Sequence, residues 1–141
     1  MSAVLGIILG YIIGGVVFGK IFTKAGYKGW AAFVPFYDIY IKGEIAKKGW
    51  RIQSCIAYIG FNIVIFIGQL AKANGYTNPI LGIILFIICL YGIIMYFRVY
   101  FNIGKRFVSE SFGVLNCIPL INVATILYMA FGSCTYKKEE Y

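Results

Sequence analysis

Charge-free apolar stretches alternate with short polar ones along the whole chain. A helix needs about 20 apolar residues to cross the hydrocarbon core of a bilayer, so runs of this length predict membrane spans. We expect about four transmembrane helices, at residues 3–19, 52–71, 80–101 and 112–132. Residues 29–46, after the first span, carry charges and a proline, which predicts a short interfacial or re-entrant helix. The predicted fold class is an all-α membrane protein.

Basic residues gather at the ends of the apolar segments. Seven of the 13 Lys and Arg residues fall within 20–51, three within 98–111 and one in the loop after the second span. Cytoplasmic loops carry an excess of basic residues, so 20–51 and 98–111 are predicted to be cytoplasmic and the N-terminus to lie outside. Four spans would also put the C-terminus outside, and we expect the tail, 133–141, to be loose.

Composition limits the classes of protein that fit. The chain has 141 residues, is 61% hydrophobic and 13% charged, and has a mean hydropathy of +0.84. A soluble domain has about 25% charged residues, so residues 1–141 are predicted to form a single membrane domain. The net charge of +8 fits a bilayer with anionic headgroups as partner, and no nucleic acid is expected because the charges flank apolar segments. No cofactor or metal site is expected, since the chain has no histidine and its four cysteines lack ligand spacing.

Small and polar residues within the spans are candidates for helix packing. Gly6, Gly10 and Gly14 recur at every fourth residue, which allows another helix to approach closely in lipid. Polar or charged groups at membrane depth need partners, and we expect interhelical hydrogen bonds, with a transport pathway as the alternative. These residues are Asn62, Gln69, Arg98, Asn116 and Asn122.

The interfacial element holds the candidate binding residues. Trp30, Tyr37 and Tyr40 fit anchors at headgroup level. Asp38 and Lys42 are four apart, the spacing of a helical ion pair. The candidate set for lipid anchoring or for ligand recognition is Lys24, Lys28, Trp30, Pro35, Tyr37 and Asp38.

A short pattern recurs along the chain. Gly29 and Pro35, followed by Asp38, match Gly113 and Pro119, followed by Asn122, with identical spacing. A fainter third copy is Ile59-Gly-Phe-Asn-Ile. Repeats of this kind mark duplicated membrane units with a binding site between them, or arise by chance in an isoleucine-rich chain.

The run from Lys24 to Asp38 resembles a motif of an uncharacterised family of small bacterial integral membrane proteins. The motif is Lys-Ala-Gly-x-Lys-Gly-Trp followed by Pro-x-Tyr-Asn/Asp, and the sequence departs from it with Asp38 where Asn is usual and Gly60 where a second Pro is common. The similarity extends to Gly104–Phe107. Some members carry a similar domain before a signal peptidase I, but this chain has no peptidase part. The resemblance implies a bacterial inner-membrane location and a fold, and no activity.

Three classes of function can be weighed from these observations. The first is a non-enzymatic accessory, assembly or immunity-type membrane protein that acts through helix–helix and interface contacts, with another membrane protein or with itself. The second is a small oligomeric channel or transporter, with Asn62, Gln69, Asn116 and Asn122 along its path and Arg98 or Asp38 at the inner mouth. Catalysis is not expected, because there is no histidine and acidic residues are scarce near the spans.

Overall fold

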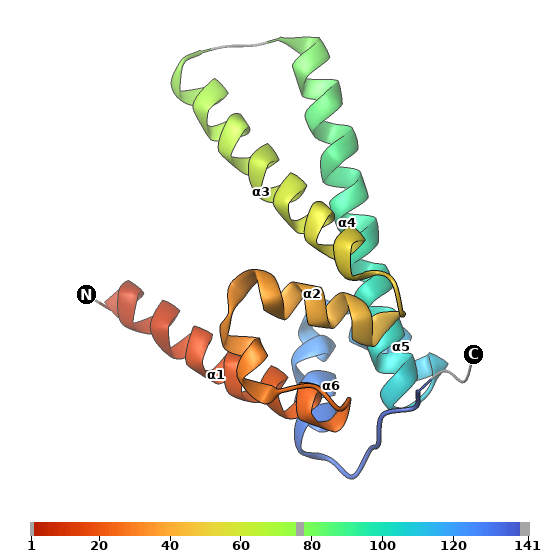
Figure 1. Ribbon diagram of the computed structural model, residues 1–141. Helices are drawn as coiled ribbons and strands as arrows, with labels where there is room; N and C mark the ends of the chain where they lie inside the picture. Colours follow the sequence, from red (N-terminus) through yellow and green to blue (C-terminus); the bar gives the residue numbers. More distant parts are fainter. Residues whose placement is uncertain (1, 76–77, 139–141) are drawn as a thin grey trace.

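The computed structural model describes residues 2–75 and 78–138, and every regular element in these ranges is a helix. The longest are α1 (Ser2–Lys24), α3 (Arg51–Ala73) and α4 (Pro79–Phe107), which cover the first three predicted spans (Figure 1). Each is long and apolar enough to cross a membrane. The all-α prediction is confirmed.

These helices extend beyond the predicted spans at their basic ends. α1 continues past residue 19 to Lys24, and α4 continues past residue 101 to Phe107. Lys and Arg side chains are long enough to carry their charges away from an apolar surface, so a helix need not end where its charges begin. The added turns pack against the rest of the chain.

The predicted interfacial element is a pair of short helices. The 3₁₀ helix η1 covers Gly29–Phe33, and α2 covers Pro35–Ala46. Pro35 takes the first position of α2, where its missing N–H is not needed and its fixed φ suits the helix. It therefore begins a new helix instead of bending an existing one.

The predicted fourth span, 112–132, is not one continuous helix. Its residues form α5 (Glu110–Asn116) and α6 (Pro119–Phe131), with a break at Cys117 and Ile118. Pro119 cannot donate the hydrogen bond that would continue α5, so it begins α6. With 13 residues, α6 is about 20 Å long, which is shorter than the hydrocarbon core of about 30 Å.

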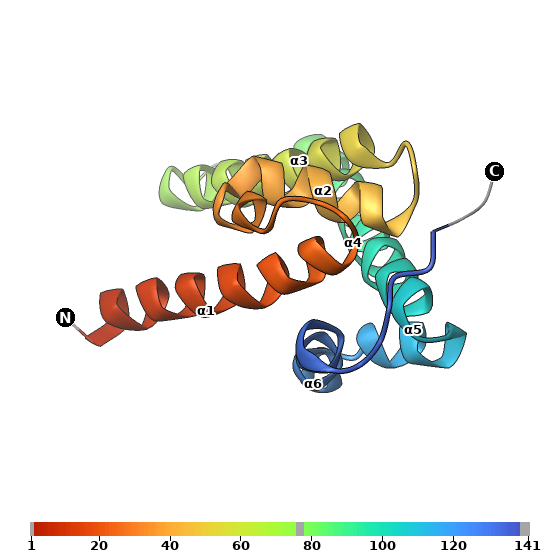
Figure 2. The ribbon, with the colours of Figure 1, turned by 60° about the horizontal axis from the view of Figure 1, so that its bottom comes forward.

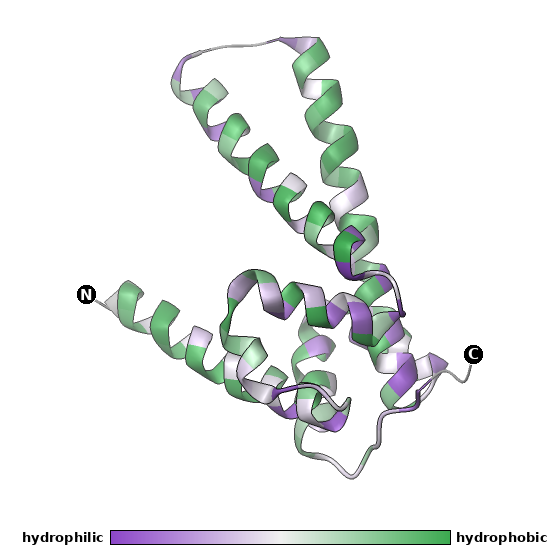
Figure 3. Cartoon of the chain, viewed as in Figure 1, coloured by the Kyte–Doolittle hydropathy of each residue, from purple (hydrophilic) through white to green (hydrophobic). Residues whose placement is uncertain are grey.

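The core lies where the basic ends of the long helices meet the short ones. Its largest fully buried apolar side chains are Ile21, Phe22, Ile45, Ile103 and Met129. α3 and α4 lie closest together beside this core and splay apart away from it, and α2 contacts both near their converging ends (Figure 1). In the view of Figure 2, α1 and α6 lie together below α2, while apolar residues cover the outer turns of α1, α3 and α4 (Figure 3).

The recurring pattern corresponds to a structural repeat. The first unit is α1–η1–α2, the second is α4–α5–α6, and in both a long helix is followed by a short helix packed against it and then by a helix that starts with proline. The match extends to Gly19-Lys-Ile-Phe22 and Gly104-Lys-Arg-Phe107, in which both phenylalanines are buried. The third copy, around Asn62, lies inside continuous α3 and has no structural counterpart.

Glycines allow the long and short helices of each unit to pack closely against each other. A Cβ at Gly19 would lie 2.9 Å from the carbonyl oxygen of Gly29, and a Cβ at Gly104 would lie 2.8 Å from Cα of Gly113. Real Cβ atoms do not approach backbone so closely. The two units then pack crosswise, since α2 contacts α4 and α6 contacts α1.

Candidate functional site

The turn after α1 explains much of the motif between Lys24 and Asp38. Gly26 has a φ of +87°, which a residue with a side chain rarely adopts. Its N–H bonds the carbonyl of Thr23 at 3.1 Å, and the N–H of Tyr27 bonds that of Phe22 at 2.8 Å. This pair of bonds is the Schellman arrangement that closes a helix C-terminus. Gly26 and Gly29 therefore have structural roles.

Lys24 lies at the contact between the two units. Its Nζ donates hydrogen bonds to the carbonyl oxygens of Met129, at 2.8 Å, and Gly132, at 2.6 Å. These carbonyls end α6, where the helix dipole favours a positive charge. Lys24 thus caps a helix far along the chain. Lys28, by contrast, is exposed at the start of η1.

Three aromatic rings form a stacked row on the outer surface of α2. The centroids of Trp30 and Tyr37 are 5.7 Å apart, and those of Tyr37 and Tyr40 are 5.9 Å apart. Trp30 is 56% exposed and Tyr37 is 41% exposed. An exposed row of Trp and Tyr suits a headgroup region, because each ring combines an apolar face with a polar atom. This arrangement supports the anchoring interpretation for Trp30 and Tyr37.

Asp38 points elsewhere, into a cavity. Its Oδ2 accepts a 2.6 Å bond from Lys42 Nζ, which confirms the expected ion pair. Lys42 Nζ also lies 3.6 Å from the centroid of the Phe18 ring. Burial raises the pKa of the Asp38 carboxyl group, and the charge of Lys42 opposes that rise. The candidate set therefore divides: the aromatic residues face outward and Asp38 faces inward.

The cavity beside Asp38 has a volume of about 700 Å³. It lies between α2, α3 and α4, and Pro35 and Tyr11 form part of its wall. Most of its lining is apolar or aromatic. Ser54 Oγ and Asp38 Oδ1, both buried, reach no hydrogen-bond partner within the described residues. A buried polar atom without a partner costs stability, and these two atoms are covered by their neighbours and closed to the cavity.

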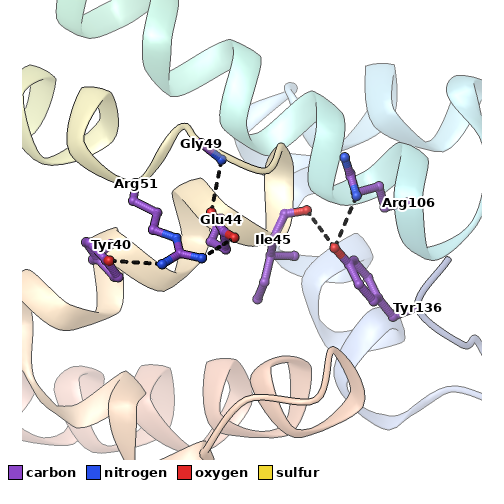
Figure 4. Close-up of polar contacts among 7 residues, drawn as sticks. All are labelled: Tyr40, Glu44, Ile45, Gly49, Arg51, Arg106 and Tyr136. Atoms are coloured by element: carbon purple, nitrogen blue, oxygen red, sulfur yellow. Dashed lines mark hydrogen bonds and ion pairs between the residues drawn. The ribbon is translucent and has the colours of Figure 1, made fainter. Parts of the chain in front are cut away.

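A second polar group lies at the other end of α2 (Figure 4). Glu44 Oε1 accepts a 2.5 Å bond from Arg51 Nη2, and Glu44 Oε2 accepts one of 3.1 Å from the Gly49 N–H. Arg51 also donates to the Tyr40 hydroxyl at 3.2 Å. The hydrogen bond from Arg51 lowers the pKa of the Glu44 carboxyl group despite burial. This pair, seven residues apart across a turn, was not predicted because it has no helical spacing.

Residues 134–137 of the tail bond to the rest of the fold, which contradicts the expectation that the tail is loose. The Tyr136 hydroxyl donates to the Ile45 carbonyl at 3.2 Å and accepts from Arg106 Nη1 at 3.2 Å (Figure 4). Arg106 Nε donates to the Ala46 carbonyl at 2.8 Å. Arg106 therefore caps α2 as Lys24 caps α6. Residues 139–141 lie outside the described part of the chain.

The polar residues of the predicted spans do not line one path in the structure. Asn62 and Gln69 lie on an exposed face of α3, and Asn62 donates to the carbonyl of Tyr58 in its own helix. Asn116 and Asn122 are buried and bonded to each other, and Asn116 Nδ2 also donates to the carbonyl of Tyr100 at 2.6 Å. They hold the break between α5 and α6.

Arg98 and the glycine ridge lie on the outside of the fold. The guanidinium of Arg98 lies 5.1 Å from the Trp50 ring, which is a cation–π distance. Gly6, Gly10 and Gly14 have no atom of the described chain within 4 Å of where a Cβ would be. The ridge predicted for helix packing therefore makes no packing contact within this chain.

Few groups in this fold can do covalent chemistry. All four cysteine thiols are free, and within residues 2–75 and 78–138 no cluster of His, Cys, Asp or Glu could hold a metal ion. The arrangement offers an exposed row of aromatic rings, largely uncovered apolar helices and a mainly apolar cavity beside Asp38. Comparison with known proteins adds no relative: no family model, no curated protein and no solved structure matches the chain.

Proposed function

We propose that the protein is a non-enzymatic accessory, assembly or immunity-type component of the bacterial inner membrane, acting through contacts of its helices with other helices. The observation that carries this proposal is that the rest of the chain covers very little of the surface of the long apolar helices. Only 11% of the apolar window of α3 and 6% of that of α4 is buried, and the glycine ridge of α1 has no neighbour. Helices in lipid associate through close van der Waals contact, which such faces provide.

The topology that fits this proposal has three crossings in place of four. Tyr136 bonds Arg106 and Ile45, so the tail lies at the basic ends of α2 and α4. If the basic loops 20–51 and 98–111 are cytoplasmic, the tail is cytoplasmic too, the N-terminus is outside, and α5–α6 re-enters without crossing. Alkaline phosphatase fused at residue 138 tests this topology. An active fusion would show that the tail lies outside and that the chain crosses the membrane four times.

The function is tested by the mass of native complexes. We would purify the protein in nanodiscs and record native mass spectra with bound partners retained. A complex with another membrane protein, or with a second copy, is expected, and Gly6→Leu, Gly10→Leu and Gly14→Leu together should dissociate it. Ile8→Leu and Ile12→Leu are the controls, because these exposed positions lie two residues away from the ridge, on the other side of α1. A monomer that binds no protein would contradict the proposal.

A small channel or transporter is the second candidate. Two proline-started helices, α2 and α6, occupy corresponding places in the two units, and the cavity lies beside the first of them. Interrupted segments in matching halves often mark a solute site. A solute flux across proteoliposomes that Asp38→Asn abolishes would favour this candidate over the accessory role.

A further inference from the structure

Two positive charges lie beside one aromatic ring where α2, α3 and α4 meet. The guanidinium carbon of Arg98 is 5.1 Å from the centroid of the Trp50 ring, and Lys47 Nζ is 5.6 Å from it. Lys47 follows α2, Trp50 precedes α3 and Arg98 belongs to α4. Both cations are exposed, whereas Trp50 packs against the core. A ring in a fixed position therefore holds two like charges near each other at the surface.

The described part of the chain leaves no carboxylate to neutralise these two charges. Each acidic residue within it is already in an ion pair: Asp38 with Lys42, Glu44 with Arg51, and Glu110 with Lys105. Lys47 and Arg98 take part in none of these pairs. Like charges repel each other, so an anion from outside the chain that contacts both cations would be attracted to this place.

The position of Arg98 along α4 fits the level of the lipid phosphates. Between Pro79, where α4 begins, and Arg98 the helix rises about 29 Å, which matches the hydrocarbon thickness of about 30 Å. Ile94 and Tyr91 lie one and two turns before Arg98 on the same face of α4, and both are exposed. An acyl chain can therefore lie along this face while the phosphate lies beside the guanidinium.

We propose that Lys47, Trp50 and Arg98 bind the headgroup of an anionic phospholipid of the phosphatidylglycerol type. The guanidinium donates bidentate hydrogen bonds to the phosphate, Lys47 adds a second positive charge, and the indole lies at headgroup level. A zwitterionic headgroup fits less well, because its ammonium group would meet two cations and no free carboxylate. This binding requires neither the protein contacts nor the solute transport discussed above, so it stands or falls separately from them.

The test is binding of phosphatidylglycerol and phosphatidylethanolamine, with identical acyl chains, to the full chain in detergent, measured by native mass spectrometry. Phosphatidylglycerol should bind at least about 5-fold more tightly, the factor expected when one basic group meets an anionic lipid. Equal affinity of the two lipids would overturn the proposal. Soluble glycerophosphoglycerol at the same concentration should not displace the lipid; displacement would assign the site to a soluble phosphate ester and refute the lipid assignment.

Variants locate the binding. Arg98→Gln should weaken binding of phosphatidylglycerol about 5-fold. Lys72→Gln is the matched control, because it removes the same charge from an exposed position at the other end of α3 and should leave the affinity unchanged. An equal loss in both variants would indicate general attraction to a basic protein and would contradict the proposal.

A second measurement does not depend on replacing Arg98. In Trp30→Phe, Trp50 is the remaining tryptophan of the chain. Phosphatidylglycerol brominated near the carboxyl ends of its acyl chains should quench the fluorescence of Trp50 more strongly than phosphatidylethanolamine brominated at the same positions. Equal quenching by the two lipids in nanodiscs would show that no anionic lipid is selected beside Trp50.

Discussion

The glycine contacts inside each unit give the sharpest test of the fold. Gly19→Ala places a Cβ 2.9 Å from the Gly29 carbonyl oxygen, and Gly104→Ala places one 2.8 Å from Gly113 Cα. The obstacle is backbone, so relief requires the short helix to move. Overpacking of this kind costs about 1–3 kcal/mol, and the gain from replacing a helical glycine by alanine is about 0.5–1 kcal/mol. A net destabilisation of about 1 kcal/mol is expected at each site.

Gly10→Ala provides the matched control within α1. No described atom lies within 4 Å of its Cβ position, so only the helix-propensity gain applies and the variant should be about 0.5–1 kcal/mol more stable. Equilibrium unfolding in mixed micelles, followed by tryptophan fluorescence, measures all three variants. If Gly19→Ala is as stable as Gly10→Ala, the close contact of α1 with η1 does not exist as described.

Three further substitutions test the polar contacts. Glu44→Gln should lose about 1–2 kcal/mol of unfolding free energy at pH 7. Because folding lowers the pKa of Glu44 from 4.5, the carboxylate stabilises the fold above that pH and this contribution is lost as the pH falls further. In a titration of stability against pH, the unfolding free energy of the variant should therefore fall less steeply at acid pH. Lys24→Met removes both caps of α6 and should cost about 1 kcal/mol, with faster hydrogen exchange confined to the last turn of α6, whereas exchange that rises uniformly would argue against a local cap. Tyr136→Phe removes the bonds to Ile45 and Arg106 while keeping the ring on Phe107; protease cleavage of the tail should accelerate, and an unchanged rate would show that the ring alone holds it.

The sequence predicts the parts of this fold that depend on local patterns. Apolar runs predict α1, α3 and α4, and the spacing of Asp38 and Lys42 predicts their ion pair. The break at Pro119 was missed because the surrounding residues are as apolar as those of a span. The break at Pro35, the matching position in the first unit, was predicted only because charged residues surround it.

Long-range contacts could not be predicted in this way. Lys24 was a candidate for lipid anchoring or ligand recognition, yet its Nζ donates hydrogen bonds to carbonyls at the end of α6. A lysine at the end of a membrane helix fits both environments equally well, and only the packing of α6 against α1 decides between them. The same holds for Tyr136, whose hydroxyl reaches Ile45 from the other end of the chain.

The reciprocal caps have a consequence for biosynthesis. Arg106, which caps the end of α2, is translated 60 residues after the carbonyl that it binds. Gly132, whose carbonyl Lys24 binds, is translated 108 residues after Lys24. At a translation rate of about 5–20 residues per second, α2 leaves the ribosome and remains uncapped for about 3–12 seconds. The first half of the nascent chain therefore enters the bilayer before the residues that cap its helices have been made. If the chain is divided in the loop after α3 and the two halves are expressed separately, they should fold only when both are in the same membrane.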